Sequence, residues 1–126
     1  MIRTELTLRL PNSPGAAASV CQLLATERVQ ISALSLSPAG HLRLIVDNPV
    51  RAFGALRDQH HHVETRDVVW LGIPSTLEGL GPLLTLISQA GVNIEYAYMS
   101  AGESGPGRGV ILGVDDPQRA AAAAGV

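Results

Sequence analysis

Apolar and polar residues alternate at the beginning of the chain and then recur at helical spacing. Leu6, Leu8 and Leu10 are separated by single polar residues, which is the period-2 pattern of a strand with one buried face. The break at residues 11–15 is rich in proline, serine and glycine. Apolar residues spaced by three or four then predict an amphipathic helix that ends near Glu27. The chain therefore begins with a strand followed by a helix.

The pattern then changes back to strands and to a second helix. Residues 31–36 and 42–46 are apolar segments separated by a short turn, which predicts a hairpin. Pro49 suits the first position of a helix, which we expect to run to about Leu56. Residues 63–65 predict a fourth strand.

The same pattern occurs a second time. Pro11 and Pro74 are 74 − 11 = 63 residues apart, and this offset superimposes the apolar positions of the first strand and helix on apolar positions. Beyond the hairpin the offset becomes 114 − 46 = 68, and Val-Asp-Asn-Pro at residues 46–49 coincides with Val-Asp-Asp-Pro at residues 114–117. Asp47 or Asn48 is expected to cap the helix that begins at Pro49, and Asp116 is expected to cap the helix that begins at Pro117. The chain is therefore a duplicated unit.

The order of strands and helices in each copy predicts an antiparallel sheet with two helices on one face, which is an α+β, ferredoxin-like arrangement. The first copy, residues 1–66, has four strands in the order βαββαβ. The second copy, residues 67–126, ends in an alanine-rich run after its second helix and lacks its last strand. That absence leaves a sheet edge open unless residues 63–66, another part of the chain or a second subunit covers it. We therefore expect a homodimer.

Composition excludes several classes of protein. Hydrophobic residues make up 46% of the 126 residues and charged residues 16%, which is enough to bury a core. The apolar runs are too short for a membrane span, and no signal peptide is evident. A net charge of −2 argues against nucleic-acid binding. The single Cys21 rules out an internal disulfide framework and suits the cytoplasm.

The order of these motifs is similar to that of a known family. Pro-Asn-Ser-Pro-Gly at residues 11–15 opens a helix, and Val-Gln-Ile (29–31) or Gly-Val-Asn-Ile (91–94) introduces the second strand of each copy. Over nearly its whole length the chain resembles small stand-alone proteins with tandem ACT domains. The resemblance implies a regulatory protein without catalytic activity that binds a small molecule, commonly an amino acid, between ACT units.

The resemblance also implies which residues hold the ligand. The first strand–helix loop falls on Asn12, Ser13, Pro14, Gly15 and Ala16. Unpaired amides at a helix start favour an anion, so the Gly15 and Ala16 N–H groups are suited to an amino-acid carboxylate. The side chain of Asn12 can both donate and accept. The same residues also form an ordinary helix start, and that alternative stays open.

The opposing wall of such a site falls on Asn93 and Ile94, whose backbone groups are suited to an α-ammonium. Asn93 is equally suited to a turn that enters a strand. The second loop, residues 74–79, departs from the first: Leu77 and Glu78 replace proline and glycine there, and an acidic side chain repels a carboxylate. We therefore expect one kind of site per chain, built mainly from the first loop.

Other chemistry-bearing residues fit structural roles as well as functional ones. Tyr96 and Tyr98 share a strand face and Glu95 the other, which suits a ligand wall, a subunit interface or a core. The three histidines at residues 60–62 lack further ligands at metal-binding spacing and fit an exposed turn. The glycine-rich residues 102–109 lack the ending of a phosphate-binding loop and fit a hairpin tip. Nothing here indicates a metal, a cofactor or a catalytic constellation.

Three functions remain in consideration. The first is a regulatory protein that binds an amino acid, and we expect this protein to be of that kind. The second is an interaction subunit that docks on a biosynthetic enzyme and has no ligand of its own. The third is a small ferredoxin-like enzyme that uses Tyr96, Glu95 or a histidine.

Overall fold

The computed structural model describes residues 1–74, 79–100 and 107–126. Its contacts divide the chain into two compact units. The N-terminal unit is Thr4–Arg66, and the C-terminal unit is Asp67–Val126 together with Met1–Arg3. Within the described ranges, no helix combines the length and the apolar character that crossing a bilayer requires.

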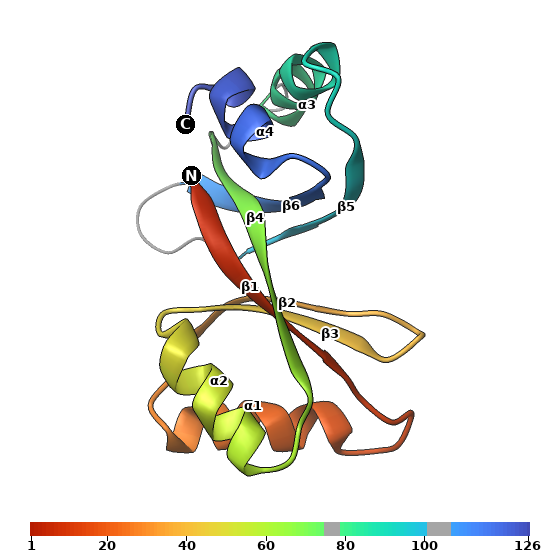
Figure 1. Ribbon diagram of the computed structural model, residues 1–126, viewed down its shortest axis with the longest axis vertical. Coiled ribbons are helices and arrows are strands. Elements are labelled where there is room, and N and C mark those ends of the chain that lie inside the picture. Colours follow the sequence, from red (N-terminus) through yellow and green to blue (C-terminus); the bar gives the residue numbers. More distant parts are fainter. Residues whose placement is uncertain (75–78, 101–106) are drawn as a thin grey trace. The chain divides into compact units, whose positions relative to one another are not determined.

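The N-terminal unit packs two helices against one face of an antiparallel sheet (Figure 1). Its elements are β1 (Ile2–Arg9), α1 (Ala16–Thr26), β2 (Ile31–Leu36), β3 (His41–Val46), α2 (Pro49–Asp58) and the beginning of β4 (Val63–Pro74). The strands lie in the order β2-β3-β1-β4, with Leu6 opposite Leu44. Leu6, Leu8 and Leu10 are buried with Val20 and Leu24 of α1, as their spacing predicts. Helix α2 runs two residues past the predicted Leu56.

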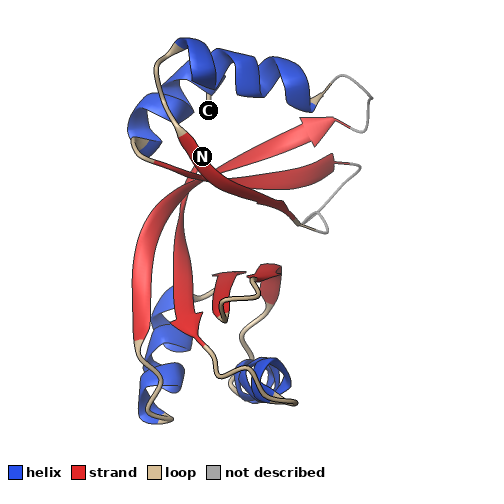
Figure 2. Cartoon of the chain, turned by 90° about the vertical axis from the view of Figure 1, so that its right-hand side faces the viewer, coloured by secondary structure: helices blue, strands red, loops and turns tan. Residues whose placement is uncertain are grey.

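The C-terminal unit repeats this layering, with helices on one face of its strands (Figure 2). Its elements are the rest of β4, then α3 (Leu80–Gln89), β5 (Ile94–Met99), β6 (Gly107–Val114) and α4 (Pro117–Ala124). The strands lie in the order β4-β6-β5, and Trp70 of β4 is opposite Ile111 of β6. The buried core joins Val69, Leu71 and Ile73 to Ile87 and Leu112. The offset of 63 residues superimposes Leu6, Leu8 and Leu10 on Val69, Leu71 and Ile73, and all three of these residues are buried as expected.

The beginning of β1 pairs with β4 at the edge of the C-terminal unit. The Met1 amino group donates to the Trp70 carbonyl at 2.8 Å, and the Trp70 N–H donates to the Met1 carbonyl at 2.7 Å. The Arg3 guanidinium lies 4.6 Å from the centre of the Trp70 ring. Partial burial, and secondarily the Arg3 charge, lower the pKa of the Met1 amino group. The edge is therefore covered by another part of the chain, which is one of the alternatives that the sequence left open, and the edge by itself gives no reason for a homodimer.

The strand-to-helix junctions make the same hydrogen bonds in both units. Asp47 accepts from the Gln30 N–H at 2.9 Å, and Asp115 accepts from the Asn93 N–H at 3.1 Å. The side chains of the following residues, Asn48 and Asp116, each accept from the N–H group three residues later at 3.1 Å. The cap of α2 is therefore Asn48 rather than Asp47. The Asp47 carboxylate instead binds the backbone of Gln30, the residue before β2.

Candidate functional site: a cavity beside the β1–α1 loop

The loop between β1 and α1 turns sharply and leaves the helix start without a side-chain cap. The Ser13 N–H donates to the Pro11 carbonyl at 2.9 Å, and the Ala16 N–H donates to the Ser13 carbonyl at 3.4 Å. Gly15 precedes the helix with a φ of 84°, a conformation that glycine adopts without strain. No side chain hydrogen-bonds to this helix start, all of which lies in the described ranges.

The turn between β2 and β3 lies against the end of β1. The Leu10 N–H donates to the Gly40 carbonyl at 2.7 Å. Gly40 has a φ of 85°, and a Cβ at this position would collide with the Leu10 carbonyl oxygen. A glycine is therefore required here, and it lets the hairpin end approach the β1–α1 loop.

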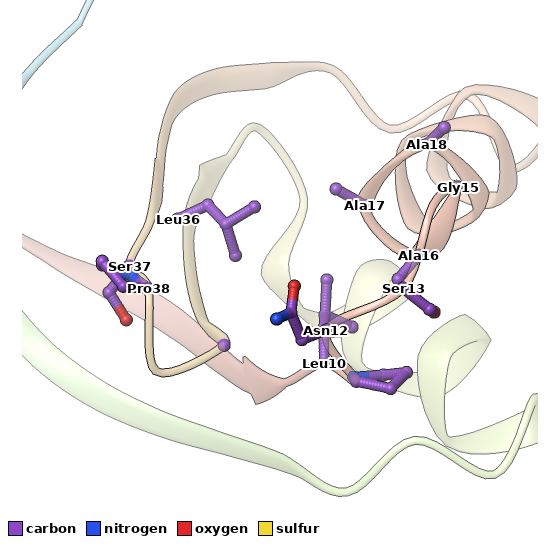
Figure 3. Close-up of a pocket in the computed structure, with 12 residues that line it drawn as sticks. Leu10, Asn12, Ser13, Gly15, Ala16, Ala17, Ala18, Leu36, Ser37 and Pro38 are labelled. Atoms are coloured by element: carbon purple, nitrogen blue, oxygen red, sulfur yellow. The ribbon is translucent and has the colours of Figure 1, made fainter.

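Between the loop and the hairpin end lies a cavity of about 420 Å³ (Figure 3). Its loop and helix side is formed by Leu10, Pro11, Asn12, Ser13, Gly15, Ala16, Ala17 and Ala18. Its hairpin side is formed by Leu36, Ser37, Pro38 and Gly40. The volume lies in the range of about 300–1,000 Å³ that is usual for small-molecule sites.

The electrostatics of the cavity favour an anion at the helix start. The first amides of a helix have no intrahelical acceptor, and the helix dipole places partial positive charge there. The first turn of α1 contains no acidic residue that would neutralise that charge. Among the described residues that line the cavity, none carries a charged side chain. A carboxylate at this helix start would meet donors and no competing anion.

The structure brings most of the predicted loop residues together. Asn12, Ser13, Gly15 and Ala16 line the cavity. Pro14 lines an adjoining cavity of about 310 Å³, which His61 also lines.

Asn93 and Ile94 belong to the C-terminal unit and do not line the cavity. Ile94 is the first residue of β5 and packs against the core of that unit. The Asn93 N–H is occupied by Asp115, as described above. Asn93 thus has the turn position that the sequence left open as an alternative.

The hairpin side of the cavity is the part that the sequence analysis missed. Residues 37–40 were predicted as a turn, and Leu36 as the end of a strand, without a role in binding. The signal was Gly40, because a glycine in a turn can mark a close approach of two backbones. The predicted second loop and the glycine-rich hairpin tip fall largely on residues 75–78 and 101–106, which lie outside the described residues.

Tyr96 and Tyr98 lie on the sheet face away from the helices. They are opposite Gly113 and Ile111, which alternate along β6 with the core residue Leu112. Their ring centres are 6.4 Å apart and the rings are inclined by 17°. A Cβ on Gly113 would collide with the Tyr96 ring. The glycine therefore makes room for a tyrosine stack, and Glu95 beside it is exposed.

The histidines form no metal site in the described part of the chain. His62 lies 3.6 Å from Glu64 as an exposed pair. In residues 1–74, 79–100 and 107–126, no group of three or more histidine, cysteine or carboxylate side chains is arranged to hold a metal ion. The positive φ of 66° at His60 belongs to the turn before β4 that the sequence predicted.

The chain is similar to several solved structures. Protein BT0572 from Bacteroides thetaiotaomicron is 30% identical, with a TM-score of 0.87 over 98% of this chain and 86% of that one. The regulatory subunit of aspartate kinase from Thermus thermophilus, in a ligand-free form, is 21% identical, with a TM-score of 0.67 over 99% and 92%. Escherichia coli aspartokinase III in complex with lysine and aspartate is 21% identical, with a TM-score of 0.57 over 97% and 30%.

At 21% identity these last two likenesses show the fold alone, and they confirm the predicted α+β fold with ferredoxin-like, ACT-type units. No family model matches the sequence, and no curated protein matches it.

Proposed function

Because the chain belongs to the same family as protein BT0572 from Bacteroides thetaiotaomicron, and because its fold is that of aspartate kinase regulatory subunits, we propose that it is a regulatory protein that binds a free amino acid. It needs no cofactor for this role and performs no catalysis. The single cysteine fits a site of action in the cytoplasm.

The observation that carries this proposal is the combination of an uncapped helix start with a cavity. Helices α2 and α4 are capped by Asn48 and Asp116, whereas α1 and α3 have no side-chain cap, and α1 opens onto a cavity of about 420 Å³. The ligand carboxylate takes the place of the missing cap at Gly15 and Ala16, where the Ala16 N–H makes only a long contact of 3.4 Å with the Ser13 carbonyl. The Asn12 side chain supplies a further polar contact.

We further propose that a second copy of the chain completes the site. Asn93 and Ile94 would form the opposing wall, with Asn93 offering its side-chain amide to the ligand and Tyr96 and Tyr98 lying nearby on the same strand. Such a homodimer rests on this division of the site between copies and no longer on an open sheet edge. Light scattering at ligand saturation should give the mass of two chains, and a monomer there would contradict this part of the proposal.

The proposal is tested by thermal unfolding with each of the twenty amino acids. A ligand that binds only the folded state raises the unfolding temperature by mass action. The amide of the best amino acid should bind about tenfold to a hundredfold more weakly, because it lacks a charge-assisted contact of about 1.5–3 kcal/mol.

A matched pair of glycine variants locates the site. Gly15 and Gly125 both have positive φ, 84° and 76°, and neither has an atom near the position of an added Cβ. Gly15→Val and Gly125→Val therefore strain the backbone alike, but only Gly15 lines the cavity. Gly15→Val should abolish ligand-induced stabilisation and Gly125→Val should keep it. Equal responses of the two variants would contradict the proposed site.

An interaction subunit of a biosynthetic enzyme is the second candidate. Leu34 of β2 and Met99 of β5 are 42% and 46% exposed on the two outer strands, where apolar side chains are available to a partner protein. If no amino acid stabilises the protein, this candidate replaces the first.

A further inference from the structure

We infer that the cavity selects amino acids with uncharged aliphatic side chains over those with charged side chains. This inference rests on the proposed function, since it concerns the same cavity. It extends the proposal from the backbone of the ligand to its side chain.

The cavity is lined by neutral polar side chains and by apolar ones. Asn12, Ser13 and Ser37 are its neutral polar side chains. Leu10, Leu36 and Pro38, with the alanines of α1, form the apolar wall. In Figure 3 the Leu36 side chain extends from β2 toward Ala17 of α1. If the ligand carboxylate occupies the helix start, the ligand side chain lies against this apolar wall.

A charged ligand side chain would lose water there without gaining a partner. A buried charge is tolerated when an opposite charge or several hydrogen bonds compensate its desolvation. Recognition of lysine would require a carboxylate at the wall, and recognition of aspartate a second cationic group. The described lining residues offer neither, and the residues proposed to close the cavity from the second copy, Asn93, Ile94, Tyr96 and Tyr98, carry no charge either. An aliphatic side chain pays no such penalty and gains from the removal of apolar surface from water.

The exposure of Leu36 also favours a ligand with an aliphatic side chain. Leu36 is 48% exposed although it lies on the sheet face that carries the core, opposite the fully buried Leu42. An aliphatic ligand side chain would cover this exposed leucine. Leu34 is nearly as exposed, at 42%, lies on the same face of the same strand opposite Leu44, and does not line the cavity. The strand thus contains its own matched control.

The experiment compares the wild type with Leu36→Asp and Leu34→Asp. Binding of valine, leucine and isoleucine is compared with that of lysine, arginine, aspartate and glutamate by calorimetric titration. In the wild type, the charged amino acids should bind at least about tenfold more weakly than the best aliphatic one. Leu36→Asp should weaken the aliphatic ligands at least about tenfold and make lysine the better ligand. Leu34→Asp should keep the wild-type order.

Three outcomes overturn the inference. Lysine or aspartate binding the wild type as tightly as leucine overturns it, and the proposed function survives if Gly15→Val abolishes that binding. Equal effects of Leu34→Asp and Leu36→Asp also overturn it, because they show that the cavity wall does not decide selectivity. Absence of binding by every amino acid overturns both proposals. Circular dichroism of both variants confirms that the substituted proteins are folded.

Discussion

The two junctions between a hairpin and the helix after it are alike, whereas the two outer strands are not. At the junctions, Asp47 and Asn48 make the hydrogen bonds that Asp115 and Asp116 make in the other unit. On the outer strands, Ala33 and Ser35 of β2 occupy the positions that Tyr96 and Tyr98 occupy in β5, at the offset of 63 residues. Opposite Ala33 lies Ile45, and opposite Tyr96 lies Gly113.

The difference separates residues that form the fold from residues that distinguish the copies. A turn bond and a helix cap satisfy backbone groups that any such unit leaves unpaired, so both copies keep them. The pairs on the outer strands instead differ in which strand holds the larger side chain. In the N-terminal unit, a small alanine of β2 faces a large isoleucine of β3, and in the C-terminal unit a large tyrosine of β5 faces a glycine of β6. The total volume is similar in both pairs, but only β5 presents aromatic hydroxyl groups.

The largest expected effect tests whether the two cores are equivalent. Leu44 and Leu112 are at matching positions of the two copies and both are fully buried. Leu44→Ala and Leu112→Ala should each lower the free energy of unfolding by about 2–5 kcal/mol, through lost transfer energy and a residual cavity. Chemical denaturation measures both values. Val50→Ala, at a residue 84% exposed, is the control and should change stability by less than about 0.5 kcal/mol.

The next effect tests the glycine and tyrosine pair. Gly113→Ala forces a Cβ into the Tyr96 ring and should cost about 1–3 kcal/mol. In a Tyr96→Ala background the same change should cost much less, because the ring is gone. Gly72→Ala, at a strand position with open space around an added Cβ, is the matched control in the same unit. An unchanged cost of Gly113→Ala in the Tyr96→Ala background would show that the ring is not the obstacle.

A smaller effect tests the likeness of the junctions. Asn48→Ala and Asp116→Ala each remove a side-chain acceptor from the N–H of the third helical residue, and each should cost about 1 kcal/mol. Thermal unfolding of both variants at one pH gives the comparison. If only one substitution has a cost, the two caps are equivalent in geometry but not in energy.

The smallest effect concerns an arginine over an aromatic ring in each unit. Arg3 lies 4.6 Å from the Trp70 ring centre, and Arg57 lies 5.6 Å from that of Phe53. Arg3→Ala should cost about 0.5–1 kcal/mol and change the fluorescence of Trp70, the only tryptophan. Arg57→Ala should leave that fluorescence unchanged, and an equal change in both variants would contradict a local effect of Arg3.

The parts of the fold that depend on local pattern were predictable from the sequence. The alternation of Leu6, Leu8 and Leu10 predicted a strand, and the repeated Val-Asp-Asx-Pro segments predicted the start of a helix in each unit. The role of Met1–Arg3 was not predictable in this way, because strand pairing between residues about 70 positions apart has no local signal. The loop side of the cavity followed from the helix-start motif, whereas Leu36 and Pro38 joined it only through the contact of Gly40 with Leu10.

Strands β1 and β4 each have residues in both units, and this limits how the chain can be divided into fragments. No single cleavage of the backbone yields two intact halves, because a cut before Asp67 leaves Trp70 without the strand partner that Met1 provides. The two units therefore cannot be obtained as separate intact fragments by one cut, although the hydrophobic pattern of the first is repeated in the second.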